Sequence, residues 1–592
     1  MRACKNPRAV HYVRAMKGKI RSALILCAGY GSRLRPLTDR LPKPLLPAGG
    51  RPALFAAIDK LRPAGIRDFF VNVHHLPEKF AEAFGLPAGT FADSRVAEAR
   101  YKDCRVRLVC EPEILDTGGA VKNLLPLLDL SEPLAVHNGD IIFSSPAEEF
   151  LAAAEANLAD KNCAATLCLR SSGNLPNVGV GDSGDVRDMR FALGAPFGRL
   201  AQYAGFFVLN PPAFKFFADR AEDKFSIVET FLDVLRSGGR LAGIFDDAGD
   251  WADIGTLSEY ARLGAEAAPD GWTALARLCV AGFSPDKGEV VPVSKGASAR
   301  KFYKFARDGE RLVACFYAEN PRENFLYAPL AEFLHGRGVP VPEVKFHDPQ
   351  SRMIVMRDAG ARDLGALPPA DRRKFYFDAL RAAKKVHSIS AGEFARAGIE
   401  LCPPFDGALY AWEQNYFFEE CARGVFGIGL PRPEEDFGTL SRELAGFPQS
   451  PLLRDFQSQN VMVSEAGKIA LIDFQGMRFG NPLYDMASLL FDPYVEPFGE
   501  DFIDAALREY LAFMPRADFP GFAESRRMLN FAAVERLLQA LGAYGFLSRK
   551  KGMAGYEKYF EPAAKNLLCR AQLCGLEGVR EFAAAILGKL RK

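Results

Sequence analysis

Two separate groups of side chains in the sequence have the types and spacing needed for chemistry on phosphates. The first follows a short apolar run at residues 23–28, where Gly29 and Gly31 precede Arg33 and Lys43. Glycines after a strand let backbone N–H groups approach a phosphate closely. The two basic side chains supply the positive charge that a triphosphate and a pyrophosphate leaving group require. This segment is therefore expected to bind a nucleotide, with Arg33 and Lys43 as catalytic residues.

The second group consists of Asp455, Asn460 and Asp473. Phosphoryl transfer to a hydroxyl needs one carboxylate to orient the hydroxyl and accept its proton, and an amide and a second carboxylate to hold Mg²⁺ on the phosphates of ATP. The three residues have this order and spacing, and Asp473 follows a buried strand expected at residues 469–472. Asp455 is thus the predicted catalytic base, and Asn460 and Asp473 are the predicted metal ligands.

The composition supplies enough apolar material to position both groups. The chain has 592 residues, of which 48% are hydrophobic and 25% are charged, as in ordinary globular proteins. Its length allows two large domains or three to four smaller ones. A net charge of +2 favours neither nucleic acid nor a membrane surface as partner. The expected partners are small sugars, sugar phosphates and nucleotides, and the oligomeric state is left open.

The cysteines and the N-terminal residues indicate in which cellular compartment the protein is expected. The twelve cysteines are scattered, without a CxxC pair or zinc-ligand spacing, which is typical of a reducing compartment. Residues 1–19 form an N-terminal extension, and the apolar run after it is too short for a signal peptide. No segment approaches the roughly 18 apolar residues of a membrane span. A cytoplasmic protein is therefore expected.

A longer run of matches extends the first group. The stretch GYGSRLRPLTDRLPKPLLPAGGRP at residues 29–52 resembles the sugar-1-phosphate nucleotidyltransferase family. The resemblance covers about residues 20–268 and implies an α/β fold, Rossmann-like with a mixed sheet of the GT-A type. It also implies that the nucleotide is bound by Ala28, Gly29 and Gly31, and by Gly118 and Gly119 in a loop similar to the one that receives the base.

Two further stretches of this resemblance carry carboxylates. Asp140 follows a strand expected at residues 134–136, at the sheet edge where ligands of open α/β sheets bind, and Asp253 lies in the stretch GDWADIGT at residues 249–256. The resemblance implies that this pair holds Mg²⁺ between the two reacting phosphates. The residues at positions where relatives contact the sugar are Asn138, Gly205 and Glu229. His74 and His75, by contrast, are expected to serve packing or surface roles.

The second group resembles kinases of the aminoglycoside phosphotransferase type. That resemblance implies a bilobal α+β protein-kinase-like domain at residues 285–592, with an N-lobe at 285–360 and a C-lobe at 361–592. Asp473-Phe474-Gln475 stands in for the usual D-F-G, and Asp485 corresponds to an aspartate that ties the catalytic loop to the next helix. Leu453 occupies the place of a usual histidine, which braces the loop.

The expected N-lobe has its own irregularity. Residues 295–305 resemble a phosphate-covering hairpin, in which Ser298 and Arg300 are predicted to bind the nucleotide. The following strand, at residues 311–317, lacks the lysine that protein kinases place there. Arg300 or Lys301 is left to supply that charge.

The segment at residues 403–417 narrows the kinase branch. It resembles a segment of the anomeric N-acetylmuramate/N-acetylglucosamine kinases of peptidoglycan recycling, which implies Asp406 and Glu413 as acceptors for sugar hydroxyls. By itself the same stretch is an amphipathic aromatic helix on a core. The two halves then make consecutive steps, in which ATP phosphorylates the anomeric hydroxyl of a free amino sugar and UTP converts the sugar-1-phosphate to an NDP-sugar.

Two alternatives remain open at this level. One is a choline kinase joined to a phosphocholine cytidylyltransferase, which combines the same folds, although the stretch RLRPLTDRLPKPLLP favours the sugar branch. The other is a nucleotidyltransferase with a regulatory pseudokinase. Leu453 and the absent strand lysine favour the pseudokinase, and the intact set of Asp455, Asn460 and Asp473 opposes it.

Overall fold

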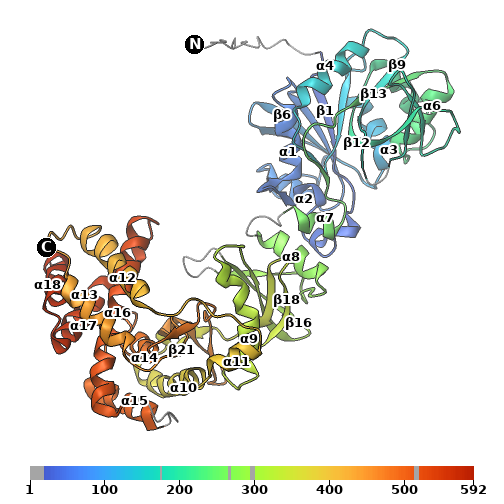
Figure 1. Cartoon of the computed structure of the whole chain (residues 1–592). Coiled ribbons are helices and arrows are strands. Elements are labelled where there is room, and N and C mark those ends of the chain that lie inside the picture. The colour runs from blue at the N-terminus through green and yellow to red at the C-terminus, as the bar shows by residue number, and fades with distance from the viewer. Residues whose placement is uncertain (1–18, 174–175, 264–268, 294–299, 513–518, 592) are drawn as a thin grey trace, which may run out of the picture. The chain divides into compact units, whose positions relative to one another are not determined.

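The computed structural model describes all residues except 1–18, 174–175, 264–268, 294–299, 513–518 and 592. The chain divides into two compact units, residues 1–288 and 289–592 (Figure 1). Helix α8 (Gly271–Val280) packs on α7 (Leu257–Arg262) and so lies in the first unit, beyond the expected limit at residue 268.

Unit 1 is built on a mixed β-sheet with the strand order β11-β10-β12-β7-β1-β4-β6-β5, and β9 joins β12 to β13. Strands β7, β1, β4 and β6 are parallel, whereas β5 and β12 are antiparallel to their neighbours. The sheet strands are β1 (Ser22–Leu26), β4 (Asp68–Val73), β5 (Val96–Tyr101), β6 (Cys104–Cys110), β7 (Leu134–Asn138), β9 (Cys163–Arg170), β10 (Val178–Val180), β11 (Val186–Met189), β12 (Arg199–Leu209) and β13 (Arg240–Phe245). This mixed α/β sheet confirms the expected fold class.

Helices cover both faces of this sheet, which explains the continuous apolar runs of its central strands. In β1, Leu24 packs on one side while Ala23 and Ile25 pack on the other. The Leu24 face is covered by α3 (Asp116–Leu124), α5 (Phe214–Ala218) and α6 (Ile227–Arg236). The opposite face is covered by α1 (Ala53–Leu61), α2 (Pro77–Ala83) and α4 (Ala147–Asn157).

Two short strand pairs complete unit 1. Strands β2 (Pro47–Ala48) and β3 (Arg51–Pro52) form a small hairpin after the glycine segment. Strand β14 (Trp251–Asp253) runs antiparallel to β8 (Ile141–Phe143), with Asp253 opposite Ile141. The backbone N–H of Ile254 also donates to the carbonyl of Asp140, at 3.2 Å. This pairing joins two stretches that lie more than a hundred residues apart in the sequence.

Unit 2 begins with an antiparallel sheet of order β15-β16-β17-β19-β18. Helix α9 (Tyr327–His335) packs against this sheet and shares its core with the rest of the unit. The strands are β15 (Val291–Val293), β16 (Lys301–Arg307), β17 (Glu310–Phe316), β18 (Val344–Asp348) and β19 (Met353–Arg357). A small lobe of this kind is the expected N-lobe.

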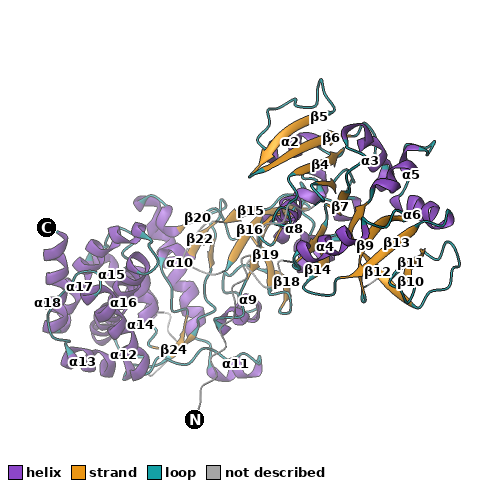
Figure 2. Cartoon of the chain, turned by 90° about the horizontal axis from the view of Figure 1, so that it is seen from above, coloured by secondary structure: helices purple, strands orange, loops and turns teal. Residues whose placement is uncertain are grey.

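The remainder of unit 2 is mainly helical, and its helices α15 to α18 gather at the end away from strands β15 to β19 (Figure 2). Short strands carry the catalytic segment: β20 (Arg362–Asp363), β21 (Ser450–Leu452), β22 (Val461–Val463), β23 (Ile469–Leu471) and β24 (Arg478–Gly480). The helices are α10 (Pro369–His387), α11 (Ala391–Arg396), α12 (Gly407–Tyr416), α13 (Glu434–Ala445), α14 (Leu483–Leu490), α15 (Glu500–Ala512), α16 (Phe522–Arg549), α17 (Phe560–Cys574) and α18 (Glu577–Leu590). This two-lobed arrangement confirms the kinase-like fold. Among the described residues, none of the helices has the length and apolar character to cross a bilayer.

Candidate active sites

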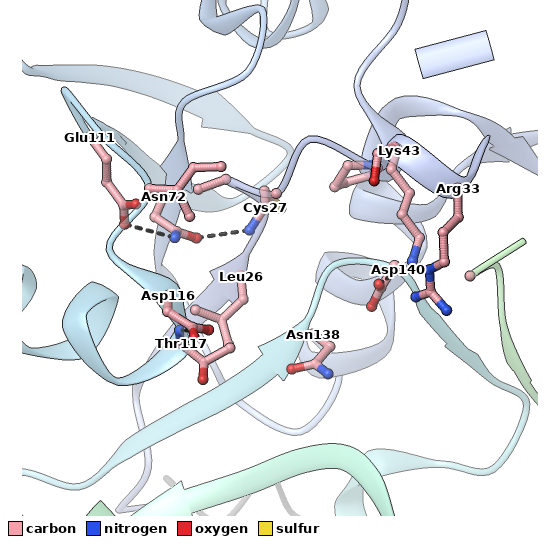
Figure 3. A pocket seen from close by; sticks show the side chains of 17 residues that line it. Leu26, Cys27, Arg33, Lys43, Asn72, Glu111, Asp116, Thr117, Asn138 and Asp140 are labelled. Carbon is pink, nitrogen blue, oxygen red and sulfur yellow. Dashed lines mark hydrogen bonds and ion pairs between the residues drawn. The ribbon is translucent and has the colours of Figure 1, made fainter. Parts of the chain in front are cut away.

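Unit 1 contains a cavity of about 330 Å³ at the carboxyl ends of β1 and β7 (Figure 3). The cavity brings together most of the residues that the sequence predicted for nucleotide binding, catalysis and metal binding. Its lining includes Ala28, Gly29, Gly31, Arg33, Lys43, Asn138 and Asp140. The sheet positions these side chains because parallel strands end at a common edge.

Lys43 lies between two carboxylates at this edge. Its ammonium donates a short hydrogen bond to Asp140 Oδ2 and lies 3.5 Å from Asp253 Oδ1. The Asp253 oxygen is buried and accepts no hydrogen bond. Burial raises the pKa of Asp253; the ammonium of Lys43 opposes this shift, and the charge of Asp140 adds to it. The two carboxylates thus converge on one positive charge, which in this structure is the ammonium of Lys43.

The glycine segment brings the second basic residue to the same side. Arg33 lies in the short 3-10 helix η1 (Ser32–Leu34), and its guanidinium forms no hydrogen bond or ion pair with the described residues. Figure 3 shows it beside Lys43 and Asp140. Gly31 turns the chain with φ +62°, and a Cβ there would lie 2.8 Å from Thr38 Cγ2. Glycine is therefore required at position 31, and Arg33 is available to an anion.

A buried polar chain fixes the glycine segment to the loop before α3. Asn72 of β4 accepts the backbone N–H of Cys27 through Oδ1, at 2.8 Å, and donates through Nδ2 to Glu111 Oε1, at 2.9 Å (Figure 3). Glu111 Oε2 in turn accepts the N–H of Leu115, at 3.3 Å. Burial raises the pKa of the Glu111 carboxyl. Asn72 was not among the predicted residues, and its one signal in the sequence is a single amide in the apolar strand DFFVNV.

Gly118 and Gly119 were predicted to contact the base, but in the structure they pack against residues 223–225. Both backbone N–H groups donate to the carbonyl of Phe225, at 2.9 and 3.2 Å. A Cβ on Gly119 would lie 2.1 Å from the carbonyl oxygen of Asp223. Close packing against residues 223–225 therefore requires both glycines, and these two N–H groups are not available to a base. Asp116 and Thr117 line the cavity beside them.

The three predicted sugar-contacting residues of unit 1 lie in different settings. Gly205 has φ +84°, and a Cβ there would lie 3.2 Å from Asn138 Nδ2, so Gly205 and Asn138 are neighbours. Glu229 closes a capping box with Ser226 at the start of α6 and pairs with Arg220, at 3.1 Å. The structure thus gives Glu229 a capping role and places Asn138 alone of the three in the lining of the cavity.

The two histidines lie next to the glycine segment. The hydroxyl of Tyr30 is 3.2 Å from His74 Nε2, and His75 Nε2 is 2.6 Å from the carbonyl of Thr38. These contacts support the loop and do not place a histidine among the carboxylates. They agree with the packing role expected for both residues.

In unit 2 the catalytic loop is held by Asp485 of α14. Asp485 Oδ2 accepts the N–H of Leu453 at 2.6 Å, and Oδ1 accepts the N–H of Arg454 at 2.8 Å. These bonds stabilise Arg454 at φ +72°, a conformation that costs a non-glycine residue free energy. The tie between loop and helix that the sequence indicated is present.

A histidine from elsewhere in the chain supports the same carboxylate. His387, the last residue of α10, lies with Nε2 3.0 Å from Asp485 Oδ2 and with Nδ1 2.7 Å from the hydroxyl of Tyr510. His387 and Asp485 are both buried. Leu453 fills the place of the usual histidine with a buried apolar side chain, and Asp485 is braced by His387 instead.

Asp485→Asn is expected to destabilise unit 2 and to weaken phosphotransfer. An amide presents N–H groups to backbone donors, so at least one buried hydrogen bond is lost, at a cost of about 2 kcal/mol. The kinase rate should fall about tenfold because Asp455 loses its position. Calorimetric melting and ATP turnover measure both effects. The control is Asp378→Asn, at an exposed ion pair on α10, and equal behaviour of the two variants would contradict the bracing role.

Asp455 itself is reached by a buried cation from α16. Arg536 Nη2 lies 3.9 Å from Asp455 Oδ1 and donates to Gln457 Oε1, at 3.1 Å. Asp492 accepts both the N–H and the hydroxyl of Ser458, at 2.8 and 2.5 Å. The loop around Asp455 is therefore fixed from two sides, and its carboxylate remains partly exposed.

The predicted metal ligands of unit 2 lie close to this loop. Asn460 donates through Nδ2 to the backbone carbonyl of Asp455, at 2.8 Å, which leaves its Oδ1 for another partner. Asp473 Oδ1 lies 2.5 Å from Arg300 Nη2 and accepts Gln475 Nε2, at 2.9 Å. Arg300 thus connects the N-lobe hairpin with the aspartate of D-F-Q. Ser298, the other predicted nucleotide contact, lies outside the described residues.

Two lysines lie on β16, next to the strand at residues 311–317 that lacks one. Lys304 Nζ lies 3.0 Å from both carboxylate oxygens of Asp358 and donates to the carbonyl of Gly360, at 3.2 Å. Lys301, in contrast, is exposed. Of the two predicted residues, Arg300 reaches the carboxylate of Asp473.

The predicted sugar acceptors of unit 2 occupy opposite environments. Asp406 is exposed and caps α12, accepting the N–H of Leu409 at 2.9 Å. Glu413 has 0% exposure, and its oxygens accept the hydroxyl of Tyr484 at 3.3 and 3.1 Å. Burial raises the pKa of Glu413 to about 7, although Arg454 opposes the shift. In this structure Glu413 faces the interior, so it does not present an oxygen to a sugar.

The folds and carboxylate sites define a two-site transferase, and comparison with known proteins assigns each unit to a family. The nucleotidyl transferase family matches residues 22–268, and the phosphotransferase enzyme family matches residues 289–524. The chain therefore joins a nucleotidyltransferase to a kinase-type phosphotransferase. Both expected resemblances are confirmed.

Individual relatives match one unit each. N-acetylmuramate/N-acetylglucosamine kinase of Pseudomonas aeruginosa is 25% identical over 278 residues, which are 45% of this chain and 79% of that protein. N-acetylmuramate alpha-1-phosphate uridylyltransferase of Caulobacter vibrioides is 29% identical over 256 residues, 41% of this chain and 95% of that protein. For mannose-1-phosphate guanyltransferase of Schizosaccharomyces pombe the identity is 27%, and the match spans 40% of this chain and 62% of that protein. The crystal structure of HddC from Yersinia pseudotuberculosis aligns with 41% of this chain and 98% of its own, at 21% identity and a TM-score of 0.32.

Proposed function

We propose that this chain is a bifunctional enzyme that makes a UDP-sugar from a free N-acetyl amino sugar. Unit 2 phosphorylates the anomeric hydroxyl with ATP, and unit 1 transfers the uridylyl group of UTP to the sugar-1-phosphate, releasing pyrophosphate. One observation carries the proposal: the two units have separate relatives, both of which are named for N-acetylmuramate. The kinase product of one relative is the class of substrate that the other uses.

In unit 2, Asp455 is the proposed base. It accepts the proton of the anomeric hydroxyl as the bond from that oxygen to the γ-phosphorus forms and the bond from the γ-phosphorus to ADP breaks. Arg536 and Asp485 are proposed positioning residues, because one lies beside the Asp455 carboxylate and the other fixes its loop. Arg300 is proposed to contact the ATP phosphates from the N-lobe, and Asp406 remains a candidate for a sugar hydroxyl.

In unit 1, the proposed reaction is attack of the sugar phosphate on the α-phosphorus of UTP. The bond to pyrophosphate breaks as the new bond forms. Arg33 and Lys43 are proposed to stabilise the charge that develops on the phosphates. Ala28, Gly29 and Gly31 are proposed to hold the nucleotide, and Asn138, which lines the cavity, is proposed with its neighbour Gly205 to contact the sugar.

The carboxylate sets of both units fit Mg²⁺, the cation expected with nucleotide substrates. Asp140 and Asp253 would hold it in unit 1, and Asn460 and Asp473 in unit 2. Oxygen ligands of this kind suit Mg²⁺, which takes its other ligands from phosphates and water. Each proposed site has only two protein ligands, since no group of three or more His, Cys, Asp or Glu side chains among the described residues could hold a metal ion. When bound, Mg²⁺ neutralises phosphate charge.

The pseudokinase alternative is disfavoured by the way the catalytic loop is built. In a pseudokinase this loop does not take part in catalysis. Such a loop does not require Asp473 at φ +64° or the buried hydrogen bonds from Asp485, and both features are present here. The choline alternative predicts a cationic acceptor, whereas three arginines, Arg454, Arg478 and Arg536, surround the loop.

We also propose a cytoplasmic location, since the described cysteines are free thiols and both nucleotides are made there.

The proposal is tested by the acceptor and by the position of the new phosphate. The full chain is incubated with ATP, Mg²⁺ and either an N-acetyl amino sugar or choline, and phosphorus NMR identifies the product. A sugar-1-phosphate is expected. A sugar-6-phosphate or phosphocholine would refute the assignment while leaving both folds standing, because unit 1 could then not use the sugar product.

A further inference from the structure

Two arginines beside the proposed catalytic base form no ion pair with a carboxylate in the part of the chain that the structure describes. Arg454 directly precedes Asp455, and its guanidinium forms no hydrogen bond or ion pair with the described residues. Arg478 has only 8% exposure, yet it forms no ion pair with them, and its Nε donates to the backbone carbonyl of Gly476 at 3.2 Å. Arginine is rarely this buried without a charged partner.

The fold brings these two guanidinium groups together. Strand β24 pairs with β21 so that Arg478 lies opposite Leu452, two residues before Arg454. Burial and the nearby charge of Arg454 both lower the pKa of Arg478, and the charges of Glu323 and Glu413 oppose this shift. Two like charges held in a half-buried place cost free energy unless an anion joins them.

Against the effect of burial, the charges of Asp455, Glu413 and Glu323 raise the pKa of Arg454, but none of these acids forms an ion pair with it in the described structure. Asp455 carries a charge for catalysis, and Arg536 already lies beside it. Burial raises the pKa of Glu413 and so opposes its ionisation. Glu323 interacts with both arginines electrostatically, but no ion pair joins it to either one in the described structure. The guanidinium groups of Arg454 and Arg478 are therefore both left without a direct ion pair among the described residues.

Arg478 lies on a different side of the site from the residue proposed to contact the nucleotide. Arg300 marks the nucleotide side by contacting Asp473 from the N-lobe. Arg478 instead lies 5.6 Å from the ring of Phe405 and next to the Cys402 thiol. These neighbours belong to the segment that leads into α12, and the N–H of Phe405 bonds to the carbonyl of Phe479, at 2.8 Å. This segment is where the sequence placed the acceptor.

We propose that Arg454 and Arg478 bind a carboxylate on the acceptor sugar, so that the kinase prefers N-acetylmuramate to N-acetylglucosamine. The two sugars differ by the lactyl ether of N-acetylmuramate, which ends in a carboxylate. Arginine binds carboxylates through paired N–H groups, with charge-assisted bonds stronger than neutral ones. The inference rests on the proposed function of unit 2 and names its substrate.

The first test needs no variant. The unaltered chain is assayed with N-acetylmuramate, with the amide of its lactyl group and with N-acetylglucosamine. We expect kcat/KM for the acid to exceed that for the amide by about tenfold or more. Equal values for the acid and the amide would overturn the carboxylate site. Failure to phosphorylate any of the three sugars would instead defeat the proposed function itself.

A second test locates the site. Arg478→Gln should lower the ratio of kcat/KM for N-acetylmuramate over N-acetylglucosamine about tenfold, and Arg478→Lys should restore part of it. Arg508→Gln, on the exposed side of α15, is the matched control and should leave the ratio unchanged. A rise in the KM for ATP with an unchanged sugar ratio would show that these arginines serve the nucleotide, and would overturn the inference.

Discussion

Asp455→Asn is expected to abolish sugar phosphorylation while leaving nucleotidyl transfer from supplied sugar-1-phosphate nearly unchanged. The amide has the shape of the carboxylate but cannot accept the hydroxyl proton, a loss of about 10²–10⁴-fold in rate. Unit 1 should not respond, since its carboxylates lie in a separate compact unit with its own core. Coupled assays of ADP and pyrophosphate release measure the two activities in one preparation.

The matched control for this variant is Asp501→Asn, an exposed aspartate of α15, which should keep both activities. Melting curves check that Asp455→Asn remains folded. Loss of both activities in a folded Asp455→Asn chain would contradict the independence of the two sites. Retained kinase activity would show that Asp455 is not the base.

Asp140→Ala is expected to have the reverse effect. The side chain is one of the two carboxylates that contact Lys43, and its removal leaves Asp253 as the single proposed anionic ligand. Uridylyl transfer should fall about 10²-fold or more, as when a group that stabilises charge in the transition state is lost. With ATP and UTP present, sugar-1-phosphate should then accumulate, which phosphorus NMR detects directly.

Asp93→Ala, at an exposed position of unit 1, is the control for Asp140→Ala. It should form UDP-sugar at the rate of the unaltered chain. If Asp140→Ala also forms UDP-sugar at that rate, Asp140 is not needed for transfer, and the cation site proposed between Asp140 and Asp253 is wrong.

The sequence was sufficient for those features that depend on local patterns. Apolar runs ending in chemistry-bearing residues predicted β1 before Gly29 and β7 before Asp140, because a strand buried on both faces has no polar alternation. The spacing of Asp455, Asn460 and Asp473 likewise predicted a kinase loop. The catalytic and metal-binding roles of these residues stay predictions until variants are measured.

Contacts between distant segments could not be predicted in this way. The brace of Asp485 by His387 joins α10 to α14, and no local pattern links the two residues. Glu413 was expected at a sugar, but α16 and Tyr484 enclose it, so tertiary packing decided its environment. Gly118 and Gly119 resembled a base-binding loop, whereas their N–H groups are used by Phe225. Such contacts depend on which distant segments pack together in the folded chain, and local sequence patterns do not specify this.

The central claim is that one chain carries out two consecutive reactions on one sugar. The most direct test gives the purified full chain ATP, UTP, Mg²⁺ and N-acetylmuramate, with no other enzyme, and follows products by mass spectrometry. The account predicts the UDP-sugar with release of ADP and pyrophosphate, and predicts that a mixture of the Asp455→Asn and Asp140→Ala chains restores what each lacks. Formation of a sugar phosphate that unit 1 never converts, with any NTP supplied, would contradict it.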